Sequence, residues 1–139
     1  MSVLFIKMQT ITRNSNNVLY FTLTERVTLD TPFFLVRVEG RSSSIVKRFI
    51  LPSDQSSYTE RYNKFTITET SGSEILTSGT ITLTPGDYDY RIYEQSSNTN
   101  LNELQSTVTT PIEYGLLRVT GTDNTYNAPL DEKEYKYPT

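Results

Sequence analysis

The sequence contains no cysteine, no histidine and no tryptophan among its 139 residues. Because cysteine is absent, the chain has no disulfide bond and offers no thiolate ligand to a metal. Because histidine is absent as well, the commonest general base and any Ser-His-Asp arrangement are excluded. Paired carboxylates are the acid–base chemistry that this composition leaves open.

Strong charge and long apolar runs are also absent. The 13 basic and 16 acidic residues give a formal net charge of −3, and the basic residues form no stripe. Nucleic acid, which favours a clustered basic surface, is therefore not an expected partner. The apolar residues 3–6 are too few for a signal peptide or a membrane span, so no membrane partner is expected either.

The residues that are abundant are those of β-sheets. The chain has ten tyrosines and six phenylalanines, and apolar and polar residues alternate in several short segments. No segment keeps helical spacing for three turns. We predict a single all-β domain of seven to nine strands, closed as an antiparallel sandwich. The predicted inward faces are Leu19, Phe21 and Leu23; Phe34, Val36 and Val38; Phe65 and Ile67; Ile81 and Leu83; and Tyr88, Tyr90 and Ile92.

Three segments leave their local structure open. Residues 45–51 alternate in a way that can bury either of two sets, Ile45, Phe49 and Leu51, or Val46 and Ile50. Gly115 interrupts the apolar run 112–119, which indicates a bulge or a close backbone approach. Residues 98–106 are the best place for a short helical turn.

The stretch "PGDYDY", residues 85–90, resembles the tyrosine corner of immunoglobulin-like sandwiches. In that motif a tyrosine at the start of a strand bonds its hydroxyl to nearby backbone, and Tyr88 occupies its position. Tyr90 stands where antibody domains have a cysteine. Asp89, Arg91 and Tyr93 alternate with the inward residues and are predicted to point out. We therefore predict an immunoglobulin-like antiparallel β-sandwich without a disulfide.

The acidic residues form no convincing site. Asp87 and Asp89 lie two apart and could together bind Ca²⁺, but a turn position and a solvated strand position explain them better. The acidic residues near the C-terminus, Asp131, Glu132 and Glu134, lie among lysines in a stretch that is typical of a solvated tail. We predict no catalytic residue, no metal site and no cofactor, and hence no enzyme.

Tyrosines are the best candidates for interaction residues, because tyrosine supplies contact area at low entropic cost. Several fall on predicted outward faces or near the C-terminus: Tyr20, Tyr93, Tyr114, Tyr126, Tyr135 and Tyr137. Residues 122–139 lack alternation, so we predict a sandwich domain at 1–121 and an irregular C-terminal arm at 122–139. The predicted interaction residues are Tyr93, Tyr114, Tyr126, Tyr135 and Tyr137.

Two neighbouring motifs carry a resemblance to a known family. "IEYGLLRV", residues 112–119, follows "YDYRIYEQSSNTNLNELQS", residues 88–106, and precedes "DNTYN", residues 123–127. This arrangement resembles small structural proteins of tailed bacteriophages that infect Bacteroidetes, including the crAss-like phages, over about residues 60–127. The resemblance implies a virion protein that is made in the host cytoplasm, a head auxiliary protein that decorates the outside of the capsid. It implies the major capsid protein and copies of the chain itself as partners, and no catalytic residues.

Two other functions stay open at this stage. The first is a carbohydrate-binding or host-attachment module of a phage fibre or tail, which would need an exposed aromatic platform on one face. The second is a carboxylate-based hydrolase, for which the sequence offers no convincing acid–base pair.

Overall fold

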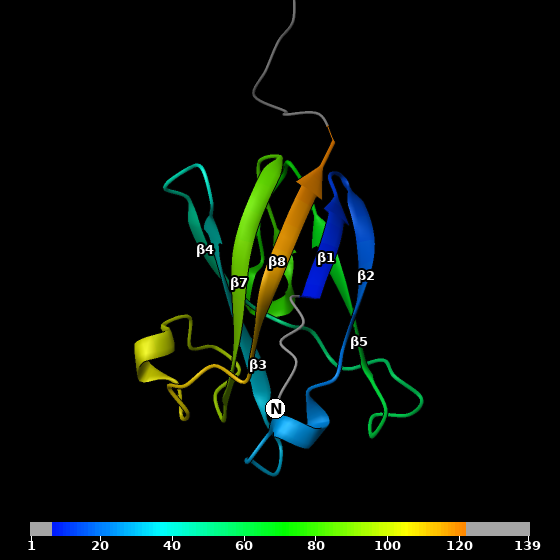
Figure 1. The fold of residues 1–139 in the computed structure, drawn as a ribbon, viewed down its shortest axis with the longest axis vertical. Coiled ribbons are helices and arrows are strands. Elements are labelled where there is room, and N and C mark those ends of the chain that lie inside the picture. The colour runs from blue at the N-terminus through cyan, green and yellow to red at the C-terminus, as the bar shows by residue number, and fades with distance from the viewer. Residues whose placement is uncertain (1–6, 122–139) are drawn as a thin grey trace, which may run out of the picture.

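The computed structural model describes residues 7–121 (Figure 1). The predicted arm at 122–139, with Tyr126, Tyr135 and Tyr137, lies outside the described residues. The described part contains strands and three short 3-10 helices, η1 to η3, and no helix in it is long and apolar enough to cross a membrane. In chain order the elements are β1 (Lys7–Thr12), β2 (Ser15–Phe21), η1 (Thr24–Arg26), β3 (Phe33–Gly40), β4 (Val46–Ile50), β5 (Asn63–Glu69), η2 (Leu76–Ser78), β6 (Thr80–Ile81), β7 (Gly86–Gln95), η3 (Glu103–Gln105) and β8 (Glu113–Thr120).

The strands form two sheets, which confirms the all-β prediction. One sheet has the order β1-β8-β7-β3-β4 and the other the order β2-β5-β6. The expectation of a purely antiparallel sandwich is wrong, because β1 runs parallel to β8 and β5 runs parallel to β6. Asn14, with φ of 58°, makes the tight turn that carries the chain from β1 into β2 of the other sheet. The strand beside β1 in its own sheet is therefore β8, close to the other end of the described chain (Figure 1).

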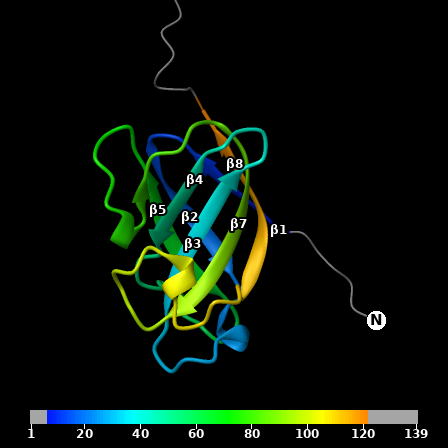
Figure 2. The ribbon, with the colours of Figure 1, turned by 90° about the vertical axis from the view of Figure 1, so that its left-hand side faces the viewer.

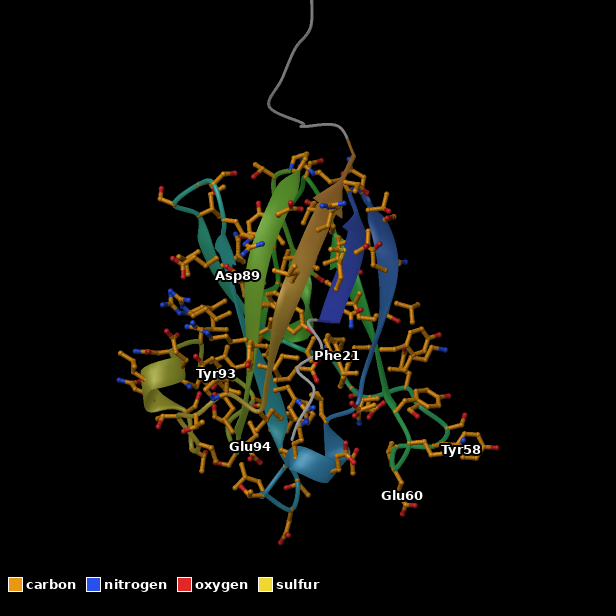
Figure 3. All side chains as sticks on the ribbon, viewed as in Figure 1. Phe21, Tyr58, Glu60, Asp89, Tyr93 and Glu94 are labelled. Carbon is orange, nitrogen blue, oxygen red and sulfur yellow. The ribbon has the colours of Figure 1, made fainter. Side chains whose placement is uncertain are left out.

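The core lies between the two sheets and consists of the residues that alternation predicted. All the predicted inward residues are buried except Phe34, which is partly buried and packs on the same core. Burying one such large apolar side chain stabilises the fold by roughly 1.5–3 kcal/mol. Phe21 of β2, labelled in Figure 3, meets Tyr90 of β7 edge to face, with ring centroids 5.8 Å apart, and this contact joins the two sheets.

A second apolar cluster lies on the other side of the five-stranded sheet, and it corrects one prediction. Tyr93 was expected to be exposed, but only 5% of it is accessible. Its ring, labelled in Figure 3, packs with Leu35 and Ile50, and Leu101 packs against them. Leu101 belongs to the segment between β7 and β8, which crosses this side of the sheet in Figure 2. Tyr93 does face away from the main core, as its place in β7 requires, but a connecting segment covers that side of the sheet.

The same cluster settles how β4 faces. Phe49 and Leu51 point into the main core, whereas Ile50 points into the second cluster. Ile45 packs against the core in part, and Val46 is 36% exposed. The first set therefore faces the main core, and of the second set only Ile50 is buried, because the other side of the sheet is covered at that end of β4.

The structure also defines the other two segments whose local structure the sequence left undecided. Gly115 pairs with Tyr90 in an unbroken register that runs from Tyr114 to Leu116, which excludes the bulge, one of the two alternatives for this position. Gly115 instead leaves β8 without a side chain opposite the large ring of Tyr90. The short helical turn predicted within residues 98–106 is confirmed as η3.

Candidate interaction surface

Tyr88 fixes the start of β7. It is 2% exposed, and its hydroxyl donates a hydrogen bond to the backbone oxygen of Thr84 at 2.7 Å. The Thr84 hydroxyl lies 3.0 Å from the same oxygen of Tyr88. The predicted bond from a buried tyrosine to nearby backbone is therefore present, and because its acceptor lies four residues upstream, it holds the turn at Pro85 against the strand.

Tyr90 belongs to a buried polar group at the opposite end of the core. Its hydroxyl donates to Glu113 Oε2 at 2.9 Å, and Arg26 Nη1 lies 3.7 Å from Glu113 Oε1. Burial, with the nearby Glu113 carboxylate, raises the pKa of Tyr90 well above its ordinary value. Tyr90 therefore stays protonated and acts as a donor that holds a buried carboxylate.

Glu113 is one of three buried glutamates that the sequence reasoning missed; the others are Glu69 and Glu94. Glu94 accepts hydrogen bonds from the backbone of Thr28 and Leu29 and so ties the loop before β3 to β7. Glu69 accepts from the backbone of Asn14 and Leu83, at 2.7 and 2.9 Å. The sequence did contain a signal for their burial. If the alternation of inward and outward residues is continued to the strand ends, each glutamate falls on an inward position. All three carboxylates hold other parts of the fold in place.

The two aspartates considered for Ca²⁺ face different arginines. Arg118 Nε donates to Asp87 at 2.9 Å, and Arg41 Nε lies 3.5 Å from Asp89. The hydrogen bond from Arg118 holds the pKa of Asp87 below its ordinary value. Within residues 7–121 no group of three or more acidic side chains could hold a metal ion.

These aspartates belong to the outer face of the five-stranded sheet, the side that points away from the other sheet. Its upper half in Figure 2 is open, whereas residues 96–112 cross the lower half. On the open part, charges follow the register in rows. Arg48, Arg37 and Arg91 are paired across β4, β3 and β7, and the next row carries Glu39 and Asp89.

Glu103 of η3 neutralises two of the three arginines. It bonds Arg48 Nε at 2.6 Å and lies 3.2 Å from Arg37 Nε, and the hydrogen bond from Arg48 lowers the pKa of Glu103. Arg91 is exposed and has no acidic partner among residues 7–121. Arg91 also lies directly opposite Arg37, and like charges at such positions repel each other. The positive charge of Arg91 is therefore not compensated within residues 7–121.

Apolar side chains continue both rows onto β8 and β1. Tyr114 lies opposite Arg91 and is 59% exposed, as predicted. Leu116 lies opposite Asp89 and beside Met8, which is 52% exposed. A hollow of about 140 Å³ opens among these rows, with Arg37, Arg91 and Tyr114 in its wall. The outer face therefore combines unsatisfied charge with exposed apolar surface.

The outer face of the three-stranded sheet is different in character. Val18 and Tyr20 of β2 are 44% and 51% exposed, and the ring of Tyr20 lies 5.9 Å from that of Tyr62. Beside them, β5 presents Lys64, Thr66 and Thr68. This second face is mostly uncharged and aromatic. The molecule thus has two exposed faces, on opposite sides of the sandwich, that carry interaction-type residues.

The sequence matches no protein-family model, and no curated protein and no solved structure is found to be similar to it. Of the predicted interaction residues within residues 7–121, the structure exposes Tyr114 and buries Tyr93. The candidate surface accordingly consists of Tyr114 with the charged rows beside it, together with the separate face around Tyr20.

Proposed function

We propose that this chain is a non-enzymatic structural protein of a bacteriophage virion, an auxiliary protein that binds the outside of the capsid. The observation that carries the proposal is the pair of exposed faces on opposite sides of one small sandwich. One face can bind the shell, and the opposite face, which then points away from the shell, can bind a further copy of the chain. The resemblance of residues 60–127 to small phage structural proteins points in the same direction.

The face around Tyr20 and Val18 suits the shell. Interfaces with proteins are enriched in tyrosine and depleted of charge at their centres. Each copy need bind only modestly, because many copies on one particle act together. The formal charge of −3 makes the packaged nucleic acid an unfavourable partner. The partners in this proposal are the major capsid protein and copies of the chain itself.

We propose further that this β-sandwich is of the immunoglobulin-like type. In variable-type domains the last, penultimate, third and fourth strands lie together in one sheet, and β8, β7, β3 and β4 have this order here. Phe21 and Tyr90 meet between β2 and β7, where antibody domains place their disulfide. The parallel pairing of the two-residue β6 with β5 departs from that pattern.

The test is binding of the purified full chain to particles of the encoding phage from which auxiliary proteins have been stripped. The wild-type chain should sediment with the particles in a saturable ratio. The double variant Val18→Ser with Tyr20→Ser should lose most of this binding. Leu104→Ser is the matched control, because Leu104 is 78% exposed and lies in η3, on the outer side of the other sheet. A wild-type chain that stays in the supernatant would contradict the proposal.

One observation favours the alternative of a carbohydrate-binding attachment module. A groove of about 570 Å³ lies beside Phe33, which is 40% exposed, and Asn98 and Thr99 line it as well. An exposed ring with nearby amide and hydroxyl groups suits a sugar. Binding on a glycan array that disappears in Phe33→Ala would support this alternative, whereas an array without binding would remove it.

A further inference from the structure

The charged rows on the outer face of the five-stranded sheet are complementary to each other. The basic row ends in Arg91 and Tyr114, and the row one step further along the strands carries Asp89 and Leu116 at the matching positions. On β3 the same order, Arg37 followed by Glu39, is already an ion pair within one copy, with Arg37 Nη1 3.0 Å from Glu39 Oε1. A surface with adjacent rows of opposite charge can pair with itself when a two-fold axis exchanges the rows.

We propose that this face binds a second copy of the chain in a symmetric, face-to-face dimer. The two-fold axis crosses the strands between the two rows. It sets Arg91 of each copy against Asp89 of the other, whereas Arg37 keeps its ion pairs with Glu39 and Glu103 of its own copy. Tyr114 then lies against Leu116, so the apolar positions match as well. The inference concerns the isolated chain and holds whether or not the chain decorates a capsid.

The uncompensated positive charge of Arg91 favours a partner that supplies a carboxylate. Within one copy, Glu103 shows how the basic row is neutralised, since its carboxylate approaches Arg37 and Arg48 from above the sheet. Arg91 lacks such a group among residues 7–121. The side chain of Asp89 is 54% exposed. Its ion pair with Arg41 is long, at 3.5 Å, so the carboxylate can also contact a second arginine.

The shape of the face agrees with the same axis. Residues 96–112 stand over the lower half, and the upper half is bare (Figure 2). A hollow of about 670 Å³ opens at that upper end, lined in part by Arg41, Asp87 and Arg118. The axis that exchanges the two rows also brings the raised segment of each copy over the open end of the other.

Charge reversal tests the register directly. Arg91→Glu sets two carboxylates against each other across the axis, and Asp89→Arg sets two guanidinium groups against each other. Each single variant should raise the dimer dissociation constant more than about a hundredfold, because the like-charge contact occurs twice in a symmetric dimer. The combined variant, Asp89→Arg with Arg91→Glu, restores both contacts and should dimerise again.

Mixing the two single variants provides the sharpest outcome. A heterodimer of Arg91→Glu with Asp89→Arg has opposite charges at both contacts, so two monomeric proteins should form a dimer when they are mixed. A folding defect would not be repaired in this way. Arg61→Glu is the control, because it reverses an exposed arginine outside these rows.

Sedimentation equilibrium of the full chain at low and high salt is the measurement. The proposal expects a wild-type dimer that weakens as salt rises, two monomeric single variants and a dimer in their mixture. A wild-type chain that is monomeric at millimolar concentration would overturn the proposal, as would a dimer that neither single variant weakens. A mixture that stays monomeric would overturn the register. None of these outcomes affects the particle-binding test, in which the altered residues lie on the other face.

Discussion

Replacing Tyr90 by phenylalanine should destabilise the domain by about 2 kcal/mol. The ring stays and continues to fill the core against Phe21, so the change removes only the hydroxyl. That hydroxyl donates to the carboxylate of Glu113, which is 2% exposed and whose Oε1 has no hydrogen-bond donor. A hydrogen bond to a charged group contributes roughly 1.5–3 kcal/mol, and its loss leaves the carboxylate buried with less compensation.

Urea unfolding of wild type, Tyr90→Phe, Glu113→Gln and the double variant isolates this interaction. In the background of Glu113→Gln the acceptor is neutral, so Tyr90→Phe should cost only about 1 kcal/mol. Tyr20→Phe is the matched control, because Tyr20 is half exposed, and its free energy of unfolding should stay within about 0.5 kcal/mol of wild type. The reasoning is refuted if Tyr90→Phe is as stable as Tyr20→Phe, or if the cost is the same with and without the Glu113 charge.

The raised pKa of Tyr90 gives the same interaction a pH dependence. The folded state keeps the Tyr90 proton at pH values where the unfolded chain, with an ordinary tyrosine pKa near 10, releases it. This contribution to stability is therefore fully present below about pH 10 and declines as the pH rises further. The loss of stability between about pH 9 and 11 should be smaller in Tyr90→Phe than in wild type, and an equal loss in both proteins would contradict the assignment.

Three further predictions follow from the contacts of single elements. Tyr88→Phe should cost roughly 1 kcal/mol in urea unfolding, because the bond to the Thr84 backbone is lost; an unchanged midpoint would contradict the corner. Leu101→Ala should increase hydrogen exchange within residues 96–112 and make Tyr93 more accessible, while the main core stays protected; equal protection in both proteins would show that Leu101 does not hold the segment. Deleting residues 124–139 should leave the melting temperature within a few degrees of wild type, because the core is built from residues 11–119; unfolding of the truncated chain would contradict this.

Alternation along the chain predicted the main core well, because it depends on a local property. In a strand, successive side chains point to opposite faces, and this was enough to place Tyr88 and Tyr90 correctly. The same rule shows which way Tyr93 points but not what covers that side of the sheet. Leu101, which covers it, comes from a polar segment whose path is set by long-range packing and by Glu103.

The strand pairing and the charged rows were beyond a reading of one sequence. The parallel contact of β1 with β8 joins segments more than a hundred positions apart, and no local pattern specifies it. The row of Arg48, Arg37 and Arg91 exists only once three strands are aligned in register. Tyr114 was predicted as an interaction residue, but the charges that surround it could not be derived without the sheet order.

Electron cryomicroscopy of assembled particles is the measurement that tests the proposed function most directly. Particles of the encoding phage would be imaged, and the densities outside the shell compared with the sandwich of residues 7–121. We predict a regularly repeated density of this shape on the outer surface of the head, with the face around Tyr20 toward the shell. Copies found only along the tail, or particles that contain none of the protein, would contradict a capsid decoration protein.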